Sequence, residues 1–176
     1  MTIISFGISL ILIILATGFD GIMAGASLDQ VIKQLPARHE IGPKAFSAYS
    51  QAADLSNGII WYATIGIGSA LFTIAAAISI FRQGSSYYYY AIPIYVAATL
   101  SIAHSVVTAY AAPTNFQQLE VSYDEQALIQ VFDHFEQLSL VRAALQVAAF
   151  GAMLLGLYVR LGHRGSVKLV SSPTRY

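Results

Sequence analysis

Four long stretches of apolar residues, separated by more polar connectors, dominate the pattern of this chain. They cover approximately residues 3–26, 58–81, 89–112 and 138–161. A helix needs roughly 20 predominantly apolar residues to cross the hydrocarbon core of a membrane, and each stretch reaches that length. Because lipid offers the backbone no hydrogen-bond partner, we expect helices rather than strands. The pattern therefore predicts an all-α integral membrane protein, an up-down four-helix bundle that forms one domain over residues 1–176.

The first and third connectors are long and carry helical patterns of their own. In the first, Pro36 is expected to end an extension of the first span, Gly42 and the proline after it predict a turn, and residues 44–53 can resume a helix. In the last, Pro113 is expected to stop the third span, and residues 123–137 predict a separate amphipathic helix. We therefore expect short amphipathic helices in the two outer loops, covering one end of the bundle.

Composition and charge add sidedness to this fold. Hydrophobic residues make up 56% of the chain and charged residues only 10%, which is unusual for a soluble protein. All nine acidic residues lie in the two long connectors or at the segment ends that border them. Lysine and arginine number five on the side of the termini and four on the acidic side. By the positive-inside rule, we expect the termini in the cytoplasm and the acidic connectors outside.

The first apolar segment could also be a cleaved signal peptide, because residues 24–26 (AGA) resemble a cleavage site. No basic residue precedes the segment, however, and its apolar run is longer than that of a typical signal peptide. We therefore expect the first helix to be retained.

Several classes of function are disfavoured by what the sequence contains. There is no cysteine, so neither disulfides nor thiolate chemistry can operate. The chain has no Gly-rich phosphate loop, HExxH zinc pattern or GxSxG elbow, and its few, scattered basic residues do not suggest nucleic-acid binding. His104, Asp20 and Asp54, together with Glu136 or His134, could in principle meet at a metal, but no span carries two ligands at a metal-binding spacing. We expect no metal and no bound cofactor.

Polar residues at membrane depth are the informative ones, because an ionisable group in a span is costly and suggests a functional site. Each span contributes such residues near its acidic-side end, at spacings of three or four that place them on one helix face. We therefore predict a cavity in the outer half of the bundle. Its expected lining residues are Asp20, Asp54, Asn57, His104, Thr108, Arg142 and Gln146.

The chemistry of these residues leaves two interpretations open. In the first, the cavity binds a small, largely apolar or aromatic molecule with one polar or acidic group, which Arg142 orients and with which His104 exchanges a proton. In the second, Arg142 pairs with Asp20 or Asp54, and the polar residues hold the helices together without any ligand. The other histidines are expected to be solvated; they are His39, His134 and His163.

Small and aromatic residues on the spans predict packing and membrane contacts. Gly66, Gly68 and Ala70 on the second span, and Gly21 with Gly25 on the first, are expected to let helices approach closely. The same small-residue faces could serve a homo-oligomer or a membrane partner. The tyrosine-rich residues 87–90 are expected to form an aromatic belt on the side of the termini, with Trp61 and Tyr62 near the opposite boundary.

Three stretches of the chain are similar to a known family. They are residues 35–38 (LPAR), 104–115 (HSVVTAYAAPTN) and 132–142 (FDHFEQLSLVR). Together with the four-span layout, they resemble the anthrone oxygenase-like family of small membrane proteins, most of which belong to a bacterial group of unknown function. Asn115 and Arg142 match an asparagine that recurs after the family's third span and an arginine that opens its fourth. A tryptophan that the family often has upstream of this arginine is replaced here by phenylalanine.

The resemblance implies a location in the bacterial inner membrane and a type of reaction. Fungal relatives oxidise a polyketide anthrone to an anthraquinone with molecular oxygen and no obvious bound cofactor. Such an oxidoreductase needs a base to deprotonate an acidic carbon and a group to stabilise the anion, and His104 and Arg142 are our candidates for these catalytic roles. Asn115 joins the candidate substrate-binding residues.

Two other classes of function remain. A non-catalytic membrane subunit or scaffold would use the same buried polar residues as packing contacts. A transporter would need polar groups through both halves of the membrane, and the inner halves of the spans have almost none.

Overall fold

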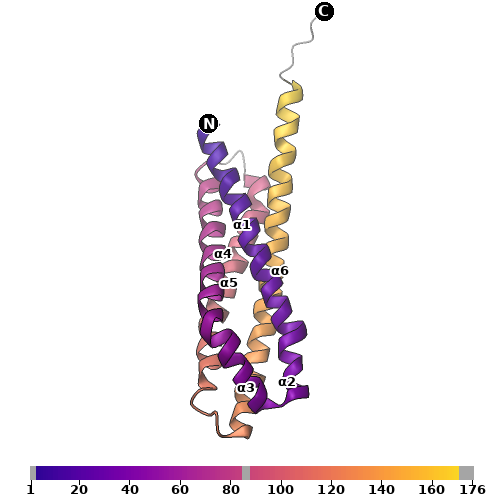
Figure 1. Ribbon diagram of the computed structural model, residues 1–176. Coiled ribbons are helices and arrows are strands. Elements are labelled where there is room, and N and C mark those ends of the chain that lie inside the picture. Colours follow the sequence, from indigo (N-terminus) through magenta and orange to yellow (C-terminus); the bar gives the residue numbers. More distant parts are fainter. Residues whose placement is uncertain (1–2, 85–87, 171–176) are drawn as a thin grey trace, which may run out of the picture.

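Four long helices form the architecture of the chain. The computed structural model describes residues 3–84 and 88–170, and it places side chains over residues 7–84 and 91–162. The long helices are α1 (Ile3–Asp29), α4 (Gly58–Phe81), α5 (Tyr88–Gln117) and α6 (Glu125–Val170). They run alternately up and down, so that the start of α1 and the end of α6 lie at one end, here called the terminal end (Figure 1). The two short helices α2 (Leu35–Ile41) and α3 (Pro43–Ala52) lie at the opposite end, here called the loop end.

The exposed surface of these helices is largely apolar, as is expected of helices that cross a membrane. Four helical stretches of the described chain are long and apolar enough to cross a bilayer, with mean hydropathy between 1.6 and 2.0. Large apolar side chains point outward within them; Ile60 is 72% exposed and Phe81 is 73% exposed. Such surface would be unfavourable in water but is satisfied by lipid. The predicted all-α fold is therefore confirmed, and the chain is a membrane protein.

Pro36 does not end the first helix, which corrects the sequence-based prediction. α1 passes into a π-helical turn, η1 (Gln30–Gln34), and Pro36 then lies in the first turn of α2. A proline ring crowds the carbonyl four residues before it, and the wider turn, in which the Leu35 amide donates to the Gln30 carbonyl, relieves that conflict. The predicted turn does occur at Gly42, whose φ of 81° favours glycine. The predicted helix over residues 44–53 follows as α3.

The second loop-end connector is shorter than predicted. α5 continues through Pro113 to Gln117, and the predicted separate helix over residues 123–137 is the beginning of α6. Asp124 caps the start of α6, because its carboxylate accepts hydrogen bonds from the backbone amides of residues 126 and 127 at 3.0 and 3.1 Å. No helix breaker stands between the amphipathic stretch and the span, so one helix contains both.

The loop end is closed by contacts between α2, α3 and the beginning of α6. Leu35, Phe46 and Phe132 are buried in one apolar cluster, in which the rings of Phe46 and Phe132 meet edge to face at 5.0 Å. Arg38, itself almost fully buried, donates to the carboxylates of Asp133 and Glu136 at 2.6 and 2.5 Å. A buried arginine needs such paired acceptors, so these ion pairs fix α2 on α6.

Only part of the predicted small-residue packing is found. α1 packs against α4 and α6, and α5 against the same two helices. A Cβ atom added to Gly68 would lie 2.4 Å from the Phe19 ring, and one added to Gly21 would lie 2.9 Å from the Phe150 ring. Both glycines therefore allow close approach of helices, as predicted. Gly25 and Gly66 have no atom within 4 Å of an added Cβ, so they make no close helix contact within the described chain.

A second π-helical turn, η2 (Ala53–Asn57), connects α3 to α4 and depends on a glycine. Within it Ser56 leaves helical geometry, with φ −101° and ψ −112°, and the chain changes direction. The next residue after the turn is Gly58, where an added Cβ would lie 2.4 Å from the Ala53 carbonyl oxygen. A backbone atom cannot move aside as a flexible side chain can. The direction of α4 relative to α3 therefore requires glycine at this position.

We predict that Gly58→Ala lowers the melting temperature in detergent, because the new methyl group collides with backbone at the kink. Gly18→Ala is the matched control, since Gly18 is also helical and has no atom within 4 Å of an added Cβ. That control should be neutral or slightly stabilising, as alanine favours a helix. Equal melting temperatures for the two variants would contradict the proposed steric role of Gly58.

Candidate functional site

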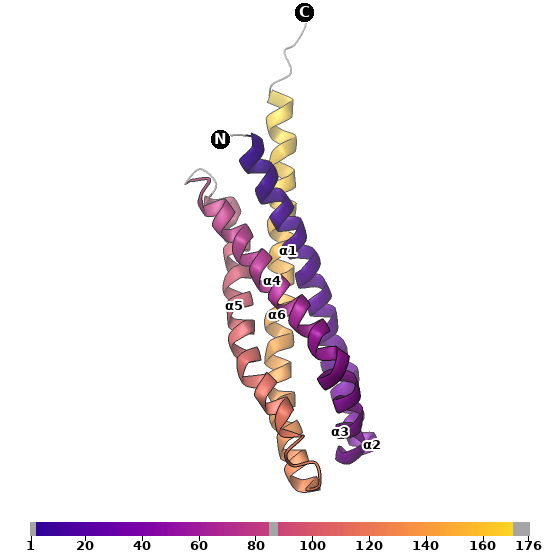
Figure 2. The ribbon, with the colours of Figure 1, turned by 60° about the vertical axis from the view of Figure 1, so that its left-hand side comes forward.

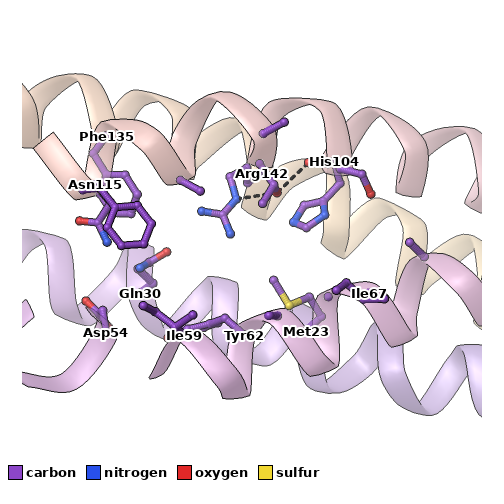
Figure 3. A pocket seen from close by; sticks show the side chains of 18 of the residues that line it. Met23, Gln30, Asp54, Ile59, Tyr62, Ile67, His104, Asn115, Phe135 and Arg142 are labelled. Atoms are coloured by element: carbon purple, nitrogen blue, oxygen red, sulfur yellow. Dashed lines mark hydrogen bonds between the residues drawn. The ribbon is translucent and has the colours of Figure 1, made fainter. Parts of the chain in front are cut away.

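A cavity of about 530 Å³ lies toward the loop end, between α4 and α5. Its lining residues come from all four long helices and from both π-helical turns. Most of them are apolar, and the polar ones include Asp54, His104, Thr108, Asn115 and Arg142. Figure 3 shows Arg142 and His104 near each other on one wall, with Ile59, Tyr62 and Met23 opposite. A cavity of this size, mostly apolar with a few polar groups, is typical of a small-molecule site.

Arg142 brings a positive charge to the cavity wall without a paired carboxylate. Its Nε donates to the Thr108 hydroxyl at 3.1 Å, and that hydroxyl donates to the His104 carbonyl at 2.8 Å. Throughout the described side chains, no carboxylate lies within 4.0 Å of its guanidinium, so the pairing with Asp20 or Asp54 that the second interpretation requires is not found. In Figure 3 the guanidinium points into the cavity. It is therefore placed to meet an anion there.

His104 lines the same cavity one helical turn before Thr108 on α5. The residue is only 5% exposed, and its buried Nε2 atom has no hydrogen-bond partner in the described part of the chain. A buried polar atom without a partner is costly, and it is commonly explained by function or by a bound molecule. The Nε2 atom can accept or donate a proton, so His104 offers acid–base chemistry within the cavity.

Both π-helical turns contribute to the cavity. Gln30 comes from η1, and Asp54 and Leu55 come from η2. The Asp54 carboxylate accepts a hydrogen bond from the Ser50 hydroxyl at 3.0 Å. A π-helical turn shifts the helix register and redirects side chains, and such turns are frequent at functional sites. The two turns therefore place polar groups at the loop-end part of the cavity.

Gln118 holds this polar end together, although the sequence analysis did not single it out. It is completely buried and its amide nitrogen donates to the Asn115 side chain at 2.8 Å and to the Ser50 hydroxyl at 3.2 Å. Its amide oxygen accepts from the Ser47 hydroxyl at 3.1 Å. The spacing of Ser47 and Ser50 on one face of α3 was the available sequence signal. Gln118 thereby positions Asn115, which lines the cavity.

Tyr62 also has a different place from the one expected. It was predicted, with Trp61, to lie in an aromatic belt at the membrane boundary. Trp61 is exposed, but Tyr62 turns inward and lines the cavity opposite Arg142. Adjacent helical residues point about 100° apart, so one of the pair can face lipid and the other the cavity.

Asp20 and Gln146 lie outside the cavity, contrary to prediction. Asp20 is completely buried, and its carboxylate accepts hydrogen bonds from Ser69 and from Thr73, the latter at 3.0 Å. The Gln146 amide donates to Asp20 at 3.4 Å. Asp20 therefore faces α4 and α6 rather than the gap between α4 and α5. The predicted Asn57 is exposed and is not among the lining residues.

The remaining predicted groups lie elsewhere. His39 is exposed, with Nε2 3.9 Å from a Glu136 oxygen, and His134 is exposed as well. His163 and the tyrosine belt of residues 87–90 lie outside the residues whose side chains are described. Over the described chain, no three histidine, aspartate or glutamate side chains gather in an arrangement that could hold a metal ion.

Comparison of the chain with family models, with curated proteins and with solved structures finds no match. The resemblance to the anthrone oxygenase-like family therefore stays a prediction from the sequence.

We predict that Asp20→Ala lowers stability in detergent by about 1–3 kcal/mol, because it leaves the hydroxyls of Ser69 and Thr73 buried without their acceptor. Asp20→Asn should be milder, since the amide oxygen still accepts one of these bonds. Thermal unfolding of both variants checks the order. Because Asp20 lies outside the cavity, Asp20→Asn should leave unchanged the affinity of a molecule that binds in the cavity. A large loss of that affinity in this variant would contradict the separation of Asp20 from the cavity.

Proposed function

We propose that the protein binds a small apolar or aromatic molecule with one acidic group in the cavity between α4 and α5. The observation that carries the proposal is the Arg142 guanidinium, which faces an apolar cavity and has no paired carboxylate among the side chains that the structure describes. A charge in a low-dielectric region is costly unless it is paired, and a ligand carboxylate would supply the missing partner.

The rest of the cavity supports the same kind of ligand. Ile59, Ile67 and Leu71 offer an apolar surface on α4. Asp54 lies at the loop-end part of the cavity, where its negative charge disfavours an anion. The acidic group of a ligand is therefore directed to Arg142, and the apolar part of the ligand points away from Asp54.

The proposal includes the location of the cavity in the cell. We place the protein in a bacterial plasma membrane with its termini in the cytoplasm, which the greater number of Lys and Arg residues on that side supports. The cavity then lies in the outer half of the membrane.

We predict that Arg142→Gln weakens binding of anthracene-9-carboxylate roughly ten- to a hundredfold, because a charged hydrogen bond contributes about 1.5–3 kcal/mol. Neutral anthracene should lose little affinity in the same variant. Fluorescence titration of protein in detergent measures both ligands, and the exposed Arg82→Gln provides the matched control at the terminal end. Unchanged binding of the carboxylate to folded Arg142→Gln would reject the proposed anion site.

Oxidation of the bound molecule is a second candidate function, favoured by His104, which lines the cavity and whose buried Nε2 has no hydrogen-bond partner among the described residues. We propose that His104 removes a proton from an acidic CH₂ group and that Arg142 stabilises the resulting anion. Molecular oxygen takes up the electrons and gives a peroxide at that carbon. Loss of water from the peroxide forms the ketone, so one CH₂ group and one O₂ yield one C=O group and one H₂O. This is the reaction type that the resemblance implies.

We predict that the protein accelerates the conversion of anthrone to anthraquinone with one O₂ consumed per product, and that His104→Gln reduces this rate about 10²- to 10⁴-fold. Absorbance and an oxygen electrode follow the reaction, and melting temperature reports folding. His104→Gln should still bind anthracene-9-carboxylate, since Arg142 is unchanged. A wild-type rate equal to that of buffer would exclude anthrone oxidation, and loss of binding in both variants together with unfolding would favour a non-catalytic scaffold.

A further inference from the structure

We infer that the cavity is loaded sideways from the membrane, between α4 and α5, and that its ligand is a long-chain carboxylate whose tail stays in lipid. This inference rests on the proposed anion site at Arg142. It adds the class of ligand and the path by which that ligand arrives.

The rim of the cavity lies on the lipid-facing surface. Ile67 and Leu71 on α4 line the cavity and are nevertheless 61% and 62% exposed. On α5, Ser105, Ala109 and Phe116 also line the cavity and are exposed. All five residues lie within helical stretches that can span the membrane. Residues that face both the cavity and the lipid mark an opening toward the membrane.

Small side chains keep this opening wide. Ala63, Gly66 and Ala70 recur at spacings of three and four on α4, and all three line the cavity. Gly66 and Ala70 were expected to bring helices together. Here α4 and α5 instead diverge from the terminal end toward the loop end, as Figure 2 shows. Because the helices separate, the small residues leave space instead of filling it.

The path from water at the loop end is more obstructed. Phe135 lines the cavity there and belongs to the buried apolar cluster that also contains Leu35, Phe46 and Phe132. The ion pairs of Arg38 hold α2 over this cluster. A ligand from that side would have to displace well-packed side chains, whereas a ligand from lipid meets an open rim.

The position of Arg142 determines how the ligand is oriented. The cavity follows α4 from Ile59 to Leu71, a distance of about 18 Å at 1.5 Å per residue. Polar groups occupy its loop-end part, and Arg142 faces Tyr62 nearer its middle. A carboxylate bound at Arg142 therefore directs its apolar tail away from Asp54, past Ile67 and out through the rim. An apolar tail is as stable in lipid as in the cavity, so its length need not be limited by the cavity volume.

The experiment uses the full chain in lipid nanodiscs and palmitate that carries a photoreactive diazirine near the end of its tail. After irradiation, peptide mass spectrometry should locate the label on the rim residues of α4 and α5, and excess palmitate should compete for it. Arg142→Gln should reduce this labelling at least tenfold. Labelling that is spread evenly over all lipid-facing helices and is not reduced by competitor would overturn the inference.

Two further variants test the route itself. Ala109→Trp should fill the rim and reduce labelling at least tenfold, whereas Val106→Trp on the same exposed surface, outside the cavity lining, should not. Ala63→Trp fills the rim from α4 and serves where Ala109→Trp fails to fold. If both folded rim variants label normally while Arg142→Gln does not, the lateral route is wrong and the anion site stands. If Arg142→Gln labels normally, the anion site and this inference both fail.

Discussion

The structure depends on one constraint, which is that lipid cannot hydrogen-bond to the polar groups that the chain places at membrane depth. At the terminal end, buried Arg160 donates to Ser9 and Gln83 at 3.2 and 2.7 Å. Farther along the bundle, the Asp20 carboxylate accepts hydrogen bonds from side chains of α4 and α6. These contacts join α1 to α4 and α6, so the same bonds that satisfy the polar groups also set which helices are neighbours.

The cavity departs from this pattern. Within the described ranges, the side chains around Gln118 bond to one another and Asp20 accepts from Ser69, Thr73 and Gln146, whereas Arg142 has one hydroxyl partner and Nε2 of His104 has none. These two residues are adjacent on one wall of a space into which a ligand fits. Native proteins keep unsatisfied buried groups mainly where function needs them. Buried atoms without a partner also occur outside the cavity in the described part of the chain, at Gln34, Arg38, Ser139 and Gln146. What distinguishes the cavity is that such an atom lies beside a guanidinium that has no paired carboxylate and beside a space for a ligand, and this combination is the main argument for a binding site rather than packing contacts.

The sequence predicted the spans well, because a run of apolar residues is a strong and local signal. Helical spacing and depth also placed His104, Thr108, Arg142 and Asp54 at the cavity, and the family resemblance added Asn115. The prediction failed for Asp20 and Gln146, because depth does not tell which neighbouring helix a residue faces, and that depends on how the helices pack. It failed for Pro36 as well, since a proline ends an α-helix but can follow a π-helical turn. Gly66 was misjudged because a small residue permits close packing without requiring it.

The kinks at the loop end explain why one bundle can be both tightly packed and open. α4 does not continue the direction of α3, because Ser56 leaves helical geometry between them. Gly58 allows the backbone to pass at this kink, and Arg38 with the apolar cluster closes the loop end. On one side of the cavity Asp20 holds α1 to α4 and α6, and at the loop end Gln118, which follows α5, bonds to Ser47 and Ser50 of α3. A cavity held open in this way need not be created by the ligand, so the free energy of binding is not spent on separating helices.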